Sequence, residues 1–201
     1  MTWYILRHAE KERGDFHNPQ LRHQDQPLSD KGRQDAQKLI GLFADIPISA
    51  IYVSAYRRTW QTAANVAEHL HLTPVIDSRL NEIDNGLVDD MTEQEFEQAY
   101  PEVWKAYVAR TADFGFPGGE SGADVQARIK DFFDEKLHLH KDADLLIVSH
   151  DGWIRQMMCY VLGLSVYRRG DFRVNFCGLT ELKYQEDVGR WELIRFNQIC
   201  W

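Results

Sequence analysis

The sequence lacks most features that mark secreted or membrane proteins. Its 201 residues include only three cysteines, and these have neither metal-binding nor redox spacing. We interpret Cys159, Cys177 and Cys200 as thiols in a reducing cytoplasm. No apolar run is long enough to cross a bilayer, and the N-terminus enters an apolar segment without the basic region of a signal peptide. We therefore expect a cytoplasmic protein that has no membrane partner.

Positive charge is also scarce. The chain has 23 lysines and arginines against 31 aspartates and glutamates, a formal net charge of −8. This balance argues against a nucleic-acid partner, and it means that an anionic substrate must be bound by a few arginines gathered in one pocket. Hydrophobic residues make up 44% of the chain, which is enough for one core, so we expect residues 1–201 to form a single domain.

The apolar runs and helical periodicities alternate along the chain. Runs at 2–7, 50–53, 73–76 and 145–148 predict strands, and segments of helical spacing lie between and after them. This alternation is typical of a mostly parallel sheet with helices on both faces. Shorter apolar runs follow at 172–176, 179–184 and 191–196, and the last two, separated by Val188-Gly189, predict a hairpin at an antiparallel edge of the sheet.

Two segments interrupt this alternation. Residues 10–29 form a long polar stretch, which we interpret as a flap beside His8. Residues 80–120 carry predicted helices near 92–100 and 101–112, and we expect them to form a helical excursion over the mouth of the sheet. Both segments are expected to shape the substrate pocket.

Polar side chains gather where the predicted strands end. Arg7 and His8 follow the first strand, His150 follows the strand at 145–148, and Arg58 follows the strand that ends before Ser54. The carboxyl ends of parallel strands meet at one edge of a sheet, so these side chains should converge.

Their chemistry suits phosphoryl transfer. Arginine binds phosphate oxygens in bidentate fashion, a neutral histidine such as His8 can attack phosphorus, and a second histidine can stabilise the transition state. The leaving alkoxide needs a proton, for which Glu82, at the start of the excursion, is the candidate.

Six ordered segments carry a family resemblance that runs from Ile5 to about Asn197. The chain resembles the histidine phosphatase superfamily, in the branch that includes cofactor-dependent phosphoglycerate mutase and small broad-specificity phosphatases. The matching segments are Leu6-Arg7-His8-Ala9-Glu10, residues 27–32, Ser54-Ala55-Tyr56-Arg57-Arg58-Thr59-Trp60-Gln61-Thr62-Ala63, Leu80-Asn81-Glu82-Ile83-Asp84 with Gly86 and Thr92, residues 117–121, and Val148-Ser149-His150-Asp151-Gly152 with Ile154-Arg155.

The resemblance implies a three-layer α/β/α sandwich, a phosphohistidine at His8, and neither a metal nor another cofactor. It also implies that Arg58, rather than Arg57, binds phosphate, and that Glu82 is the general acid.

Four positions depart from the family pattern. Ala9 replaces a glycine, a change that we interpret as tolerated, and Lys11 stands where a small hydroxyl residue is common. Gly14 replaces a phosphate-binding asparagine, so Lys11 or Asn18 would have to supply that donor. Asp151 replaces a glycine and is similar to the proton-donating aspartate of the acid phosphatase and phytase branch. It is therefore a rival to Glu82 and a candidate substrate-binding residue.

One further basic pair, Arg168-Arg169, has two interpretations. We favour a solvated basic turn, and the alternative is contact with a distal charge of the substrate. Residue pairs such as His69 and His71 do not share a helix face, which argues against a metal site.

The leading hypothesis is a metal-independent phosphomonoesterase that acts on a small phosphorylated metabolite. A phosphoglycerate mutase is disfavoured by the short chain and by Gly14. A phosphohistidine protein phosphatase and a phosphate-binding module without turnover are further alternatives. The sequence predicts neither the leaving group nor the oligomeric state.

Overall fold

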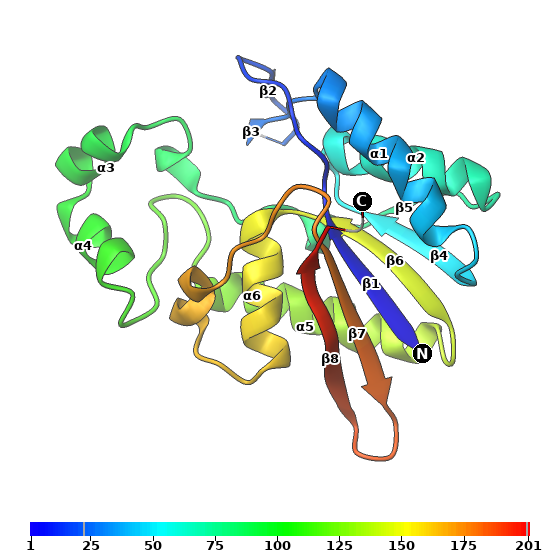
Figure 1. The fold of residues 1–201 in the computed structure, drawn as a ribbon. Helices are drawn as coiled ribbons and strands as arrows, with labels where there is room; N and C mark the ends of the chain where they lie inside the picture. Colours follow the sequence, from blue (N-terminus) through cyan, green and yellow to red (C-terminus); the bar gives the residue numbers. More distant parts are fainter. Residues whose placement is uncertain (22, 200) are drawn as a thin grey trace.

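A six-stranded sheet forms the centre of the molecule (Figure 1). The computed structural model describes residues 1–21, 23–199 and 201. The strand order is β5-β4-β6-β1-β7-β8; the first four strands are parallel, and β7 and β8 form an antiparallel edge. The strands are β1 (Thr2–Arg7), β4 (Ile48–Val53), β5 (Val75–Ile76), β6 (Asp144–Ser149), β7 (Leu179–Gln185) and β8 (Arg190–Gln198).

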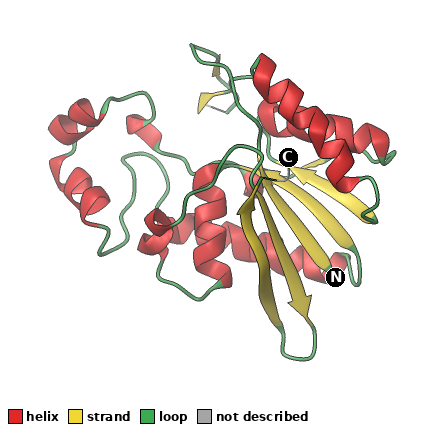
Figure 2. Cartoon of the chain, viewed as in Figure 1, coloured by secondary structure: helices red, strands yellow, loops and turns green. Residues whose placement is uncertain are grey.

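Helices cover both faces of this sheet (Figure 2). Helices α1 (Asp30–Phe43) and α2 (Arg57–His69) lie on one face, and α5 (Gly122–Leu139) and α6 (Asp151–Val161) on the other. Strand β1 sends Trp3 and Ile5 into the core beneath α5 and α6, and Tyr4 and Leu6 into the core beneath α1 and α2. A strand buried on both faces is continuously apolar, as this one is. The predicted three-layer α/β/α sandwich is confirmed.

The last quarter of the chain contains the expected hairpin. Its strands are residues 179–185 and 190–198, and the apolar run at 172–176 forms a loop. This loop crosses the carboxyl end of β1, where the carbonyl of Val174 accepts a hydrogen bond from Arg7. The apolar run therefore contacts Arg7 and does not form part of the sheet.

The flap at 10–29 folds back on itself. It contains the two-residue strands β2 (His17–Asn18) and β3 (His23–Gln24), which pair with each other, and a bridge joins Lys11 to Leu28. Asp25 fastens the flap to α2, because its carboxylate accepts hydrogen bonds from the backbone and side chain of Arg57 at 2.9 and 3.1 Å.

The excursion has a small core of its own. It holds η2 (Gly86–Val88), α3 (Glu93–Ala99) and α4 (Pro101–Ala109), with Val88, Phe96 and Phe116 buried between them. Helix α4 ends earlier than predicted, because Arg110 adopts a left-handed conformation. Both helices stand to one side of the sheet, so only the first part of the excursion reaches the strand ends (Figure 1).

Candidate active site

The carboxyl ends of β1, β4 and β6 lie in register. Arg7 pairs with Ser149, and Val53 pairs with Val148, so the residues that follow these strands emerge side by side. The backbone N–H of His8 extends the ladder by donating to the carbonyl of Ser149 at 3.0 Å. The convergence expected from the strand ends is therefore present in the structure.

A cavity of about 270 Å³, which we call the strand-end pocket, opens at this edge. Arg7, His8 and Arg58 form its walls together with residues from the flap and from the start of the excursion. The flap contributes Lys11, His23, Gln24 and Gln26, and the excursion contributes Glu82, Ile83, Asn85, Asp89 and Asp90.

The hydrogen bonds of His8 fix which of its ring nitrogens carries the proton. Its Nδ1 lies 2.7 Å from the carbonyl oxygen of Ala9, which can only accept, so Nδ1 carries the proton and Nε2 keeps its lone pair. Nε2 accepts a hydrogen bond from Nε of Arg58 at 3.3 Å. Burial, followed by the positive charge of Arg58, holds the pKa of His8 well below 6.5. His8 is therefore neutral at neutral pH, as a nucleophilic histidine must be.

His150 lies one layer beneath this pocket. Its Nδ1 accepts from Nη2 of Arg58 at 3.2 Å, so its proton is on Nε2, which donates to Oγ of Ser54 at 2.7 Å. Burial, followed by the charge of Arg58, also holds its pKa well below 6.5. Its ring centroid is 5.1 Å from that of His8, but the contact with the pocket passes through Arg58.

Aromatic rings and hydrogen bonds hold the two arginines in place, and Nη1 of Arg58 also donates to the carbonyl of Gln24 at 3.4 Å. Arg58 stacks 4.3 Å from the ring of Tyr56, and Arg7 stacks 4.2 Å from the ring of Phe176. Arg7 also donates to the carbonyl of Val174, and its Nε has no hydrogen-bond partner among the described residues. Burial lowers the pKa of both guanidinium groups, which remain cations.

Glu82 is oriented by the N-terminus of α6. Its carboxylate accepts hydrogen bonds from the backbone N–H groups of Gly152 and Trp153 at 3.2 and 3.0 Å. A Cβ atom at position 152 would lie 2.8 Å from Oε1 of Glu82, so glycine permits this close approach. The helix terminus provides donors that need an acceptor, and it thereby fixes the carboxylate at the pocket wall.

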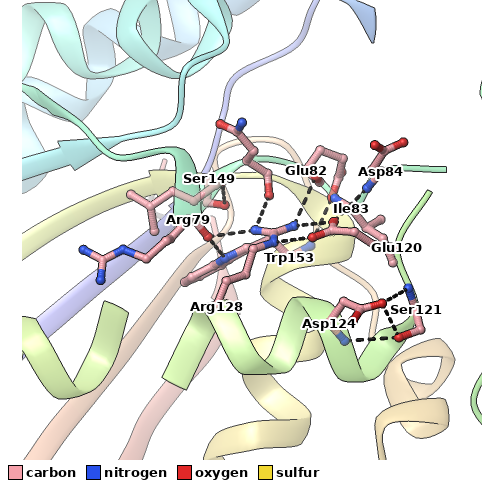
Figure 3. Close-up of polar contacts among 12 residues, drawn as sticks. Arg79, Glu82, Ile83, Asp84, Glu120, Ser121, Asp124, Arg128, Ser149 and Trp153 are labelled. Carbon is pink, nitrogen blue, oxygen red and sulfur yellow. Dashed lines mark hydrogen bonds and ion pairs between the residues drawn. The ribbon is translucent and has the colours of Figure 1, made fainter. Parts of the chain in front are cut away.

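Arg128 of α5 clamps both ends of the excursion around Glu82 (Figure 3). Its guanidinium donates to the carbonyl groups of Arg79, Asn81 and Glu82 at the entrance, at 2.7 to 3.2 Å. It also donates to both carboxylate oxygens of Glu120 at the exit, at 2.8 and 2.9 Å. The position of Glu82 therefore depends on a residue that lies far along the chain.

Asp151 lies outside the walls of the strand-end pocket. Both of its carboxylate oxygens contact Arg155, at 3.1 and 2.8 Å, and Oδ1 is 3.8 Å from Nη1 of Arg7. It lines a neighbouring cavity of about 230 Å³, which we call the side cavity. The two cavities share Glu82, Ile83 and Asn85 in their walls.

The structure distinguishes between the two residues considered as replacements for the donor missing at Gly14. Lys11 lines the strand-end pocket, where its Nζ donates to Oε1 of Gln26 at 3.0 Å, and burial lowers its pKa. Asn18 instead donates to Asp25 within the flap.

Several residues of the site were not predicted from the sequence. Ser54 and Tyr56 did have a signal, because they belong to the segment of the second arginine motif and its spacing places them near Arg58. By contrast, His23, Gln24 and Arg128 reach the site through the fold of the flap and through α5. Three-dimensional contacts of this kind leave no periodic pattern.

Comparison with known proteins identifies the family. The model described as "Histidine phosphatase superfamily (branch 1)" matches residues 3–198. The chain belongs to the histidine phosphatase superfamily. It is 31% identical over 199 residues to "Phosphoserine phosphatase 1" of Hydrogenobacter thermophilus, which covers 98% of this chain and 92% of that protein. It is also 30% identical to "Probable phosphoglycerate mutase GpmB" of an Enterobacter species, over 91% of this chain and 85% of that protein.

Solved structures share this fold. A mycobacterial glucosyl-3-phosphoglycerate phosphatase aligns with a TM-score of 0.83, at 24% identity, over 98% of this chain and 99% of that one. The same enzyme in complex with inorganic phosphate aligns with a TM-score of 0.81, at 25% identity, over 98% and 97% of the two chains. Within the part of this chain that the structure describes, no helix is long and apolar enough to cross a membrane.

Proposed function

We propose that this histidine phosphatase is a phosphomonoesterase of the cytoplasm that transfers the phosphoryl group of a small metabolite to His8 and then to water. The observation that carries the proposal is the neutral imidazole of His8, whose Nε2 lone pair lies beside Arg58 at the wall of a cavity of about 270 Å³. A phosphate would take the hydrogen bond that Arg58 now gives to His8, which frees the nucleophile as the substrate binds.

In the first step, Nε2 of His8 attacks phosphorus and the ester P–O bond breaks. Arg7 and Arg58 bind the phosphoryl oxygens, and Lys11 adds a cation at the same wall. His150 orients the guanidinium of Arg58. The carboxyl group of Glu82 gives a proton to the leaving alkoxide.

In the second step, a water molecule loses a proton to the Glu82 carboxylate and attacks the phosphohistidine. The P–N bond breaks, inorganic phosphate leaves, and neutral His8 is restored. Glu82 is preferred to Asp151 as the acid because Glu82 lines the strand-end pocket, whereas Asp151 lies outside its walls.

The test is hydrolysis of p-nitrophenyl phosphate in the presence of a chelator. The wild type should turn over, and His8→Ala should lose about 10,000-fold or more of kcat, because no other side chain replaces the nucleophile. His69→Ala, at an exposed position at the end of α2, is the matched control and should keep full activity. Equal rates for the wild type and His8→Ala would refute the proposal, and transfer between phosphoglycerates outpacing phosphate release would indicate a mutase.

A further inference from the structure

A third cavity, which we call the arginine cleft, adjoins the side cavity and has a volume of about 350 Å³. Its walls are formed by Arg110, Arg155, Gly170, Phe172, Arg173, Val174 and Asn175. The three arginines come from separate segments: Arg110 follows α4, Arg155 lies on α6, and Arg173 lies in the loop at 172–176. The fold thus gathers three cations in one cleft of a chain whose formal net charge is −8.

No carboxylate lines this cleft among the described residues, although the chain has 31 aspartates and glutamates. The other two cavities differ in this respect, because Glu82 lines both the strand-end pocket and the side cavity. Like charges gathered without an acid in the same wall repel one another, and an anion bound between them relieves that repulsion. The charge of the cleft therefore favours an anionic ligand.

Two of the three guanidinium groups form no ion pair with a described residue. Arg173 is exposed, and within the described part of the chain it has neither a hydrogen bond nor an ion pair. Arg110 donates to the carbonyl of Gly170, in the 3₁₀ helix η3 (Val166–Asp171), at 3.2 Å. A Cβ atom at position 170 would lie 2.9 Å from Nη1 of Arg110, so glycine leaves room for this guanidinium at the wall of the cleft. Both cations are available to a ligand.

The other basic residues of η3 do not line the cleft. Arg168 is exposed and pairs with Asp171. Arg169 lines the side cavity, where its Cζ is 5.0 Å from the ring centroid of Phe114. The cations of this region therefore differ in what they contact, and Arg168 can serve as a control for those of the cleft.

The arginine cleft is linked to Arg7, which we assign to the substrate phosphate, in two ways. The carboxylate of Asp151 lies between Arg155, at 3.1 and 2.8 Å, and Nη1 of Arg7, at 3.8 Å. Val174, in the wall of the cleft, accepts a hydrogen bond from Arg7 through its carbonyl. An anion that draws Arg155 into the cleft leaves Arg7 as the remaining cation beside Asp151. Arg7 then has less of its charge available for the substrate.

We propose that the arginine cleft is a second anion site, which binds a phosphate dianion and thereby weakens the binding of substrate in the strand-end pocket. The tetrahedral oxygens of such a dianion match several guanidinium groups at once, whereas a singly charged ligand would leave most of the positive charge uncompensated. The cleft and the strand-end pocket share no lining residue among those described, which favours a separate molecule over a distal part of the substrate. The binding of the anion is independent of the proposed function, and its effect on the substrate rests on that function.

Isothermal titration calorimetry with inorganic phosphate tests the site. The wild type should bind two phosphates per chain, one in the strand-end pocket and one in the cleft. The double variant Arg110→Met/Arg173→Met should bind one, because two of the three cations of the cleft are gone. Arg168→Met/Arg190→Met, which removes two exposed arginines elsewhere and changes the net charge equally, should still bind two. One phosphate bound to the wild type, or two bound to the first variant, would refute the site.

The phosphate in the cleft can be free or carried by a metabolite, and a second titration distinguishes these sources. His8→Ala, which lacks the nucleophile, is titrated with glycerol 3-phosphate. Two equivalents bound would assign the cleft to phosphate monoesters as well, and one equivalent would assign it to inorganic phosphate alone.

Hydrolysis of p-nitrophenyl phosphate in the presence of inorganic phosphate tests the coupling between the two sites. Competition in the strand-end pocket alone raises the apparent KM in a straight line with phosphate concentration. In the wild type the cleft should raise it about fivefold or more above that line, and Arg110→Met/Arg173→Met should follow the line. A straight line in the wild type would refute the coupling. If the wild type binds two phosphates but hydrolyses no ester, the proposed function fails and the anion site stands.

Discussion

The strand-end pocket and the side cavity share a wall but are built in different ways. His8, Arg58 and His150 are 4%, 5% and 0% exposed, and they follow strands or begin a helix of the central layers. The side cavity is lined by the excursion, by η3 and by the first turn of α6, and its Arg110 and Arg155 reach the surface. His8, Arg58 and His150 thus stand at the ends of strands or in the first turn of a helix, whereas the side cavity is lined mainly by connecting segments.

The difference between the two regions explains how one fold can accept different leaving alcohols. Phosphoryl transfer requires a fixed relation between nucleophile and phosphate, which the register of β1, β4 and β6 provides. The leaving alcohol can vary as the connecting segments vary without disturbing that register. Glu82 belongs to both regions, because it lies in the excursion and is held by α6 and by the Arg128 clamp.

The largest effect after loss of the nucleophile should come from the arginine that links the two histidines. Arg58→Ala should lower kcat/KM for p-nitrophenyl phosphate by about 1,000-fold or more, because it removes the cation facing the phosphoryl oxygens and leaves Nδ1 of His150 without its donor. Arg57→Ala, the preceding residue, should cost no more than about tenfold, because Arg57 pairs with Asp25 of the flap. If steady-state kinetics give similar losses of kcat/KM for the two variants, the assignment of Arg58 as a phosphate-binding residue is wrong.

A substitution at Glu82 should affect alkyl and aryl phosphate esters differently. Glu82→Gln should lower kcat for glycerol 3-phosphate by about 100- to 10,000-fold, because an alkoxide cannot leave without a proton. With p-nitrophenyl phosphate, whose phenolate leaves unprotonated, the same variant should release one nitrophenolate per enzyme in a burst and then turn over slowly, since the water-activating carboxylate is gone.

Asp151→Asn is the matched control for this experiment. It should show neither the burst nor the large loss with the alkyl ester, because Asp151 contacts Arg155 outside the strand-end pocket. If the burst appears in Asp151→Asn and not in Glu82→Gln, the rival assignment of the general acid is correct.

These contrasts also explain what could be predicted from the sequence. Apolar runs ending in Arg7-His8 and Ser149-His150 predicted the sheet edge, because strand periodicity and parallel pairing are local properties. The placement of His150 beneath Arg58 was not predicted, since it depends on how two side chains share one space. The contacts of Arg169 with Phe114 and Phe116 were not predicted either, because those residues are distant in sequence and no pattern in the chain links them.

The smallest predicted effect is on the free energy of unfolding, and it comes from the burial of His8 in the strand-end pocket. Burial, followed by the charge of Arg58, lowers the pKa of His8 in the folded protein, so below pH 6.5 the unfolded chain binds a proton that the folded chain does not. The free energy of unfolding should therefore decrease as pH falls from 6.5, and above 6.5 the histidine makes no pH-dependent contribution.

His8→Asn removes this linkage, so the stability of the variant relative to the wild type should rise by about 1.4 kcal/mol for each pH unit below that value, until the folded-state pKa is reached. Urea unfolding between pH 5.0 and 7.5 measures the difference, and His150→Asn should behave in the same way, because its imidazole is buried against the same guanidinium. If the stability curves of the wild type and both variants are parallel, the pKa values of His8 and His150 are not lowered by folding. The two histidines would then not be buried as the structure shows them.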